Sequence, residues 1–206
     1  MAEIIMITGG INSGKSDFAE EITLKKSQYN STNPIYVATS IPYDEEMKTK
    51  IRLHIEKRRG KGWHNIQAPL SLIEVVKSDY ERINSEYATK KVVLVDCITM
   101  LVSNNIFIDK SQFEKGSLSF IDEKDIYSKI DDIRSKILSE IEKTLLEIKK
   151  TEDVYLFVTN EIGLGGISGN KMTRMFAQIC GDVNKILASK SDEVYMVVSS
   201  IPMKIK

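Results

Sequence analysis

The sequence contains few of the residues that build disulfide frameworks or zinc sites. Only two cysteines, Cys97 and Cys180, and two histidines, His54 and His64, occur among its 206 residues. Two cysteines do not make a disulfide framework. The four residues also lack the spacing that is typical of zinc ligands. We therefore expect a reducing, cytoplasmic environment.

An excess of charge of either sign is also missing. The sequence balances 29 Lys and Arg residues against 29 Asp and Glu residues. A protein that coats nucleic acid or an anionic membrane would carry a basic excess, so neither partner is expected. No apolar run reaches the roughly 20 residues that span a bilayer. Residues 1–13 lack the basic start of a secretory signal.

The composition is that of an ordinary folded protein. Hydrophobic residues make up 42% of the chain and charged residues 28%, as in soluble globular proteins. At about 150 residues per domain, the length suggests one domain. We therefore expect a single domain over residues 1–206.

Apolar runs alternate with amphipathic segments along the chain. We expect strands at 3–8, 34–39, 63–67, 91–96, 154–159 and 193–200. We expect helices from residue 15 to about 27, and at 43–59, 70–86, 126–150 and 172–187. Residues 108–123 are polar and hold no clear period, so they are expected to leave the core. This alternation predicts an α/β fold with a mostly parallel sheet flanked by helices.

The first strand and helix are joined by a phosphate-loop motif of the form G-x-x-x-x-G-K-[ST]. Its residues are Gly9, Gly10, Ile11, Asn12, Ser13, Gly14, Lys15 and Ser16. The glycines allow the backbone to turn N–H groups toward one point, and the helix adds its positive end. Lys15 can neutralise the β- and γ-phosphates, and Ser16 can bind Mg²⁺. A glycine-rich turn that binds nothing is the alternative interpretation.

Asp96 ends the strand predicted at 91–96. An acid in that place of a phosphate-loop protein is typical of the second magnesium-side group, usually acting through a water. The alternative is a helix N-cap, because aspartate is favoured there.

His54 lies on the apolar stripe of the helix expected at 43–59, one turn before Arg58. Residues four apart share a helix face, so the imidazole and the guanidinium can address one ligand. The alternative is a packed histidine without a chemical role.

Further segments resemble one family, the bifunctional adenosylcobinamide kinase/adenosylcobinamide-phosphate guanylyltransferases of cobalamin biosynthesis. The resemblance runs nearly end to end, and His54 with Arg58 matches the H-x-x-x-R element of the family. The other matching segments are 7–16, 36–40, 44–47, Trp63, 96–99, 102–104, 158–163, 181–184 and 197–202. The phosphate loop is generic, whereas the combination of His54, Arg58, the Val158-Thr159-Asn160-Glu161 segment and the tail is specific.

The resemblance implies a covalent mechanism. The residue matching His54 attacks the α-phosphorus of GTP and carries GMP to adenosylcobinamide phosphate, with Lys15 and Mg²⁺ assisting at the triphosphate. It also implies ATP or GTP in the kinase step and a homotrimer. The nucleotide contacts that it implies beyond the loop lie at Ala38, Thr39, Ser40, Ile55, Glu56, Lys57, Arg58 and Asp96, and at Gln67, where the family often has glutamate.

The sequence is also compatible with two other functions. One is a small-molecule kinase in which His54 is structural and Glu161 acts as base; Glu161 can equally cap the Gly163 or Gly165 amide. The other is a nucleotide-gated binding module without turnover. The loop 163–170 differs from the family pattern, because it lacks a proline and an acid.

Overall fold

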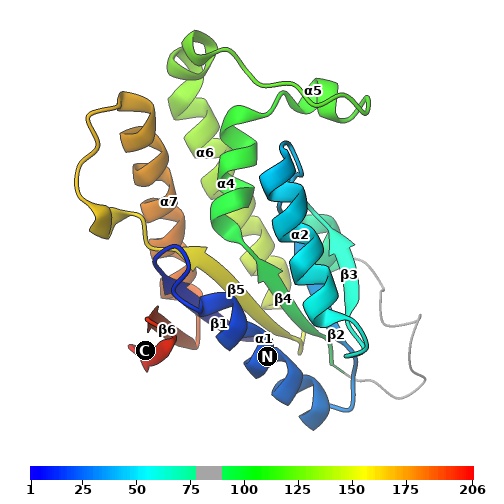
Figure 1. Cartoon of the computed structure of the whole chain (residues 1–206). Coiled ribbons are helices and arrows are strands. Elements are labelled where there is room, and N and C mark those ends of the chain that lie inside the picture. The colour runs from blue at the N-terminus through cyan, green and yellow to red at the C-terminus, as the bar shows by residue number, and fades with distance from the viewer. Residues whose placement is uncertain (78–89) are drawn as a thin grey trace.

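The protein is built around one seven-stranded sheet (Figure 1). The computed structural model describes residues 1–77 and 90–206. The strands are β1 (Glu3–Gly9), β2 (Pro34–Ala38), β3 (His64–Gln67), β4 (Val92–Asp96), β5 (Val154–Asn160), β6 (Glu193–Val198) and β7 (Ile201–Lys204). The helices are α1 (Lys15–Tyr29), α2 (Glu45–Arg58), α3 (Ile73–Lys77), α4 (Ile98–Phe107), α5 (Lys110–Phe113), α6 (Glu123–Ile148) and α7 (Lys171–Lys190), with a short 3₁₀ turn η2 (Gly163–Gly165).

The sheet order is β3-β2-β4-β5-β1-β6-β7. All neighbouring pairs are parallel except β6 and β7, so the predicted mostly parallel sheet is confirmed. The strand expected at 193–200 ends at Val198. The chain then turns at Ser199 and Ser200 and returns as β7, which the sequence did not indicate.

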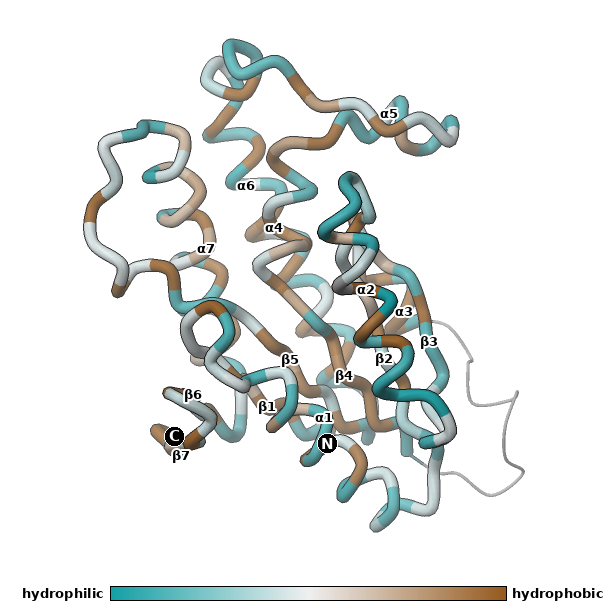
Figure 2. Tube along the Cα trace, viewed as in Figure 1, coloured by the Kyte–Doolittle hydropathy of each residue, from teal (hydrophilic) through white to brown (hydrophobic). Residues whose placement is uncertain are grey.

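The central strands are buried on both faces because helices cover each side. Along β1, Ile4 and Met6 belong to the apolar cluster that also contains residues of α3, α4, α6 and α7. The alternating Ile5 and Ile7 belong to a second cluster, with Ala19 of α1 and Tyr36 of β2. Figure 2 shows these strands as largely hydrophobic stretches of the tube. Such continuous apolar strands are typical of a doubly covered parallel sheet.

Several predicted helices need correction. Helix α4 was not predicted, because it follows β4 almost directly and six of its ten residues are buried, which hides a helical period. Of the helix expected at 70–86, only α3 and its surroundings lie within the described residues. Helix α6 runs from Glu123 to Ile148 instead of 126–150. Helix α1 continues to Tyr29, beyond the end expected at about residue 27, and Tyr29 is 89% exposed.

The polar excursion begins one residue later than expected. Ile108 is buried and forms an isolated bridge with Phe120. The residues between them carry α5 and project beyond the top of α4 in Figure 1. The excursion therefore has a buried base and an ordered short helix.

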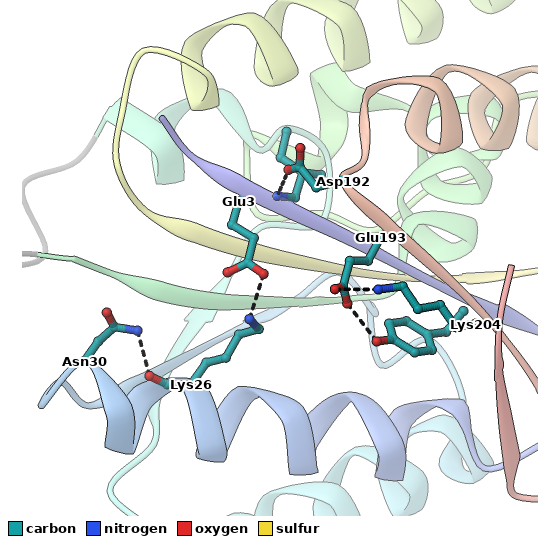
Figure 3. A network of polar contacts seen from close by, with 8 residues as sticks. Glu3, Lys26, Asn30, Asp192, Glu193 and Lys204 are labelled. Carbon is teal, nitrogen blue, oxygen red and sulfur yellow. Dashed lines mark hydrogen bonds and ion pairs between the residues drawn. The ribbon is translucent and has the colours of Figure 1, made fainter. Parts of the chain in front are cut away.

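Polar contacts tie the starts of β1 and β6 to their neighbours (Figure 3). Lys26 of α1 donates to Glu3 at 2.7 Å, and the N–H of Ile4 donates to Asp192 at 2.8 Å. Glu193 accepts hydrogen bonds from Lys204 and from Tyr195, each at 2.7 Å. These contacts hold the end of α1 and the terminal hairpin on the sheet.

Candidate active site

The residues predicted for the site gather mainly at the carboxyl ends of the parallel strands. The phosphate loop follows β1, Asp96 ends β4, and Glu161 directly follows β5. Strands β1 and β5 are neighbours in register, with Gly9 opposite Asn160, and the N–H of Glu161 donates to the Gly9 carbonyl at 3.0 Å. Open parallel sheets bind their ligands at this edge.

The phosphate loop has the backbone that its glycines allow. Gly14 has φ 89° and Asn12 has φ 56°, both in the left-handed region. A Cβ on Gly9 would lie 2.5 Å from the Val197 carbonyl oxygen, so only glycine fits between β1 and β6 there. The loop is thus shaped by close backbone approaches on its β6 side.

Lys15 lies folded against the loop. Its Nζ donates to the Gly10 carbonyl at 2.9 Å, and the residue is 8% exposed. Burial lowers the pKa of Lys15, while nearby Cys97 and Asp96 oppose that shift. Burial and the Asp96 carboxylate raise the pKa of the Cys97 thiol to about 12. Cys97 is therefore protonated at neutral pH, and a protonated thiol is a poor nucleophile.

Asp96 is held by Tyr36, whose hydroxyl donates to Oδ2 at 3.2 Å. Burial and the Asp96 charge raise the pKa of Tyr36 above its usual range, so it stays a hydrogen-bond donor. The helix-cap alternative for Asp96 is wrong, because Cys97 is the N-cap of α4 and no side chain caps that helix.

His54 is half-buried on α2. Its position along the sheet follows from a contact between α2 and α1. Lys57, in the last turn of α2, forms an ion pair with Asp17, in the first turn of α1. Helix α2 connects the parallel strands β2 and β3, so it runs antiparallel to them. His54, three residues before Lys57, therefore lies about 4.5 Å further toward the ligand edge.

The two nitrogens of the His54 imidazole differ in burial. Nδ1 is buried and has no hydrogen-bond partner among the described residues, whereas Nε2 is not enclosed in this way. The ring therefore offers Nε2 to an incoming group.

Arg58 does not share an open ligand face with His54. It is 5% exposed, pairs with Glu20 of α1 at 3.3 Å, and lies 3.4 Å from the centre of the Tyr36 ring. Its guanidinium therefore joins α2 to α1 and β2, and the geometry favours a packing role over direct phosphate contact.

The three residues before Arg58 lie on more exposed parts of α2. Ile55 is an exposed apolar residue, Glu56 pairs with Arg59 at 3.4 Å, and Lys57 is engaged by Asp17. Lys57 is thus engaged in an exposed ion pair between α2 and α1.

Thr39 is fully buried, and its hydroxyl is engaged on both sides. It donates to the Cys97 carbonyl at 2.7 Å and accepts from the Cys97 N–H at 2.8 Å. Asn104 of α4 donates to the Thr39 carbonyl at 2.7 Å. Thr39 thus ties the end of β2 to the start of α4, and these contacts use the only proton of its hydroxyl.

The remaining predicted contacts lie further along the edge. Ala38 and Ser40 are half-buried beside Thr39, and Gln67 is exposed opposite Ala38. With about 4.8 Å between strands, Ala38 lies three strands from β1, or about 14 Å across the sheet, and Gln67 lies four strands away, or about 19 Å. The structure groups the loop with Asp96 and leaves Gln67 at the far end.

Glu161, after β5, and Arg174, on α7, both have partners in the loop 163–170. Oε1 of Glu161 accepts from the Gly163 N–H at 3.2 Å, which is one of the two alternatives for this residue. Arg174 donates to the carbonyls of Ser168 and Gly169, each at 2.8 Å, so it holds the end of the glycine-rich loop.

Sequence reasoning missed a buried polar network beneath Glu161. Thr159 of β5 donates to Asn184 of α7 at 2.8 Å, and Thr99 of α4 accepts from the Asn160 N–H at 2.7 Å. The Asn184 amide donates to the Asn160 carbonyl at 3.1 Å. The network fixes the end of β5, and its residues lie in three segments of the family resemblance, 96–99, 158–163 and 181–184.

Comparisons with known proteins cover nearly the whole chain. The model of a family described as cobinamide kinase / cobinamide phosphate guanyltransferase matches residues 5–205. The bifunctional adenosylcobalamin biosynthesis protein CobU of Escherichia coli is 32% identical, over 98% of this chain and 99% of that protein. CobU of Salmonella typhimurium is 31% identical over 98% and 99% of the two chains. CobP of Pseudomonas aeruginosa is 26% identical over 98% and 96%.

The two adjacent arginines provide a test of the anchoring role. Arg58→Ala should lower the free energy of unfolding by about 3–5 kcal/mol, because Glu20 would remain buried without its partner. The matched change Arg59→Ala, at an exposed residue, should change it by about 0.5 kcal/mol or less. Urea denaturation measures both, and equal effects would contradict the packing role.

Proposed function

Because the chain belongs to the cobinamide kinase / cobinamide phosphate guanyltransferase family, we propose that it performs both reactions at one triphosphate site. It phosphorylates adenosylcobinamide with ATP or GTP, and it then transfers GMP from GTP to adenosylcobinamide phosphate. The observation that carries this proposal is the place of His54 on α2, nearer than Lys57 to the sheet edge that bears the phosphate loop, with its Nδ1 buried and without a hydrogen-bond partner among the described residues.

In the kinase step, a hydroxyl of the corrinoid side chain attacks the γ-phosphorus and the nucleoside diphosphate leaves. The loop N–H groups and Lys15 neutralise the charge that develops on the phosphates. Glu161 accepts the proton of the hydroxyl, since it is the carboxylate that follows the strand beside β1.

In the guanylyl step, His54 carries the nucleotide. Nε2 attacks the α-phosphorus of GTP, an N–P bond forms, and the bond to pyrophosphate breaks. A phosphate oxygen of adenosylcobinamide phosphate then attacks the same phosphorus and breaks the N–P bond. The products are adenosylcobinamide-GDP and free imidazole, so atoms and charge balance over the two displacements.

Ser16 and Asp96 fit a magnesium ion held together with the triphosphate. Among residues 1–77 and 90–206 there is no cluster of three or more acidic, histidine or cysteine side chains that could hold a metal alone. A hydroxyl, a carboxylate acting through water, and phosphate oxygens form the oxygen-rich set that Mg²⁺ prefers. When bound, the ion would neutralise charge on the leaving pyrophosphate.

Further features are proposed from the family resemblance. The nucleoside part of GTP extends along the edge toward Ser40 and Gln67, and the enzyme acts as a cytoplasmic homotrimer of single-domain chains. Within the described residues, no helix is long and apolar enough to cross a membrane. A kinase without guanylyl transfer is the second candidate, favoured only by the separation of Arg58 from a ligand face.

Lys15→Ala should abolish both reactions, because both need a triphosphate in the same loop. A loss of about 10²–10³-fold in kcat is expected for each, as for removal of a charge-stabilising group. Lys25→Ala, which removes an exposed lysine of α1 paired with Glu21, is the matched control and should leave both rates unchanged. Persistence of either activity in Lys15→Ala would require a second triphosphate site.

His54→Ala should remove guanylyl transfer and spare the kinase step. Incubation of the wild-type protein with GTP and Mg²⁺ should add the mass of one GMP and release pyrophosphate. The adduct should be acid-labile and alkali-stable, as expected of a phosphoramidate. His54→Ala should show no adduct and should still phosphorylate adenosylcobinamide.

His64→Ala is the control, because His64 begins β3 and so lies at the opposite edge of the sheet. It should form the adduct as the wild type does. An adduct on His64, or none at saturating GTP, would leave the kinase as the better assignment.

Tyr36→Phe should raise the Mg²⁺ concentration needed for half-maximal turnover by about 3- to 10-fold, since one hydrogen bond to Asp96 is lost. Asp96→Asn should cause a larger loss. Tyr195→Phe is the matched control, because Tyr195 also donates to a carboxylate, Glu193, on the outer strands. It should leave the Mg²⁺ dependence unchanged, and a metal titration of turnover distinguishes the two.

A further inference from the structure

The turn between β6 and β7 has an unusual backbone for its sequence. Ser199 has φ 49° and Ser200 has φ 65°, and Val198 pairs with Ile201 across the turn. A two-residue hairpin turn with both φ values positive strongly favours Asn-Gly, because a side chain is strained there. The chain instead places two serines in this conformation, and strain of this kind is concentrated at functional sites.

This turn packs directly on the phosphate loop. The N–H of Ser200 donates to the Ser13 carbonyl at 2.8 Å. A Cβ built on Gly14 would lie 2.6 Å from the Ser200 hydroxyl oxygen and 3.0 Å from the Ser200 Cα. The placement is fixed by the sheet, because β6 lies beside β1 with Val197 opposite Gly9.

The Ser13 carbonyl and the Gly14 N–H belong to the same peptide unit. In a planar trans peptide the C=O and N–H bonds point in opposite directions. A carbonyl held outward by Ser200 therefore turns the Gly14 N–H away from the hairpin. The hydrogen bond thus fixes the orientation of a donor in the loop that precedes Lys15.

We propose that the Ser199–Ser200 turn is a positioning element of the triphosphate site, which presets the Gly14 N–H to bind phosphate. Ser200 acts through the loop and need not touch the nucleotide. The left-handed conformation of Ser200 is required because it brings the Ser200 N–H to the Ser13 carbonyl. This inference rests on the proposed function, because it assumes that the loop binds the triphosphate.

The test varies the residue at 200 and measures the Kd for GTP and for pyrophosphate together with Tm. Ser200→Val disfavours the left-handed region, because β-branched side chains are poorly tolerated at positive φ. It should withdraw the N–H and raise both Kd values about 10-fold, the effect of losing one hydrogen bond to a charged group. Ser200→Ala should raise both Kd values by a smaller factor. It replaces the valine variant in the test if that variant does not fold.

Two controls separate positioning from simple stability. The double change Ser199→Asn, Ser200→Gly supplies the preferred turn residues and keeps the N–H, so Tm should rise and both Kd values should stay at or below those of the wild type. Lys204→Ala breaks the Lys204–Glu193 contact elsewhere on the hairpin, so it should lower Tm and leave Kd unchanged.

Wild-type affinity in Ser200→Val and Ser200→Ala would overturn the inference. The inference would also be overturned if Lys204→Ala raised Kd as it lowered Tm. Failure of the wild-type protein to bind GTP or pyrophosphate would instead overturn the proposed function, so the two failures are distinguishable.

Discussion

The buried guanidinium of Arg58 is the contact on which the arrangement of the site depends. It lies between Glu20 of α1 and the ring of Tyr36 on β2, and the Tyr36 hydroxyl holds Asp96 at the end of β4. A buried charge is tolerated only when it is paired and well packed. The helix that bears His54 is therefore packed in one low-energy position. That position is set by α1, which follows the phosphate loop, and by β2, whose Tyr36 contacts Asp96.

The phosphate loop itself is held by backbone contacts from both neighbouring strands. On the β5 side, the N–H of Glu161 donates to Gly9, and on the β6 side, the N–H of Ser200 donates to Ser13. His54, in contrast, is placed by side-chain contacts of α2, the ion pairs of Lys57 and Arg58. The phosphate loop is therefore positioned by main-chain contacts, whereas His54, the proposed GMP carrier, depends on side-chain contacts of its helix.

Local patterns predicted the parts of the structure that are local. The strand, loop and helix around Lys15 follow from one contiguous motif, and Asp96 follows from a carboxylate at the end of an apolar run. The i, i+4 spacing of His54 and Arg58 correctly placed them on one helix, but spacing carries no information on what that face meets. The partner of Arg58 on that face is Glu20, which lies 38 residues earlier in the chain.

The same reasoning explains why the terminal hairpin was missed. The dipeptide Ser199-Ser200 is not a preferred turn sequence, and an unbroken strand is the expected result. The turn forms because tertiary contacts with Ser13 and Gly14 select it over local preference. The mismatch between sequence and conformation is therefore informative. Where a chain adopts a turn that its residues disfavour, the contact that stabilises the turn points to the element whose geometry depends on that turn. In this protein that part is the loop that both proposed reactions share.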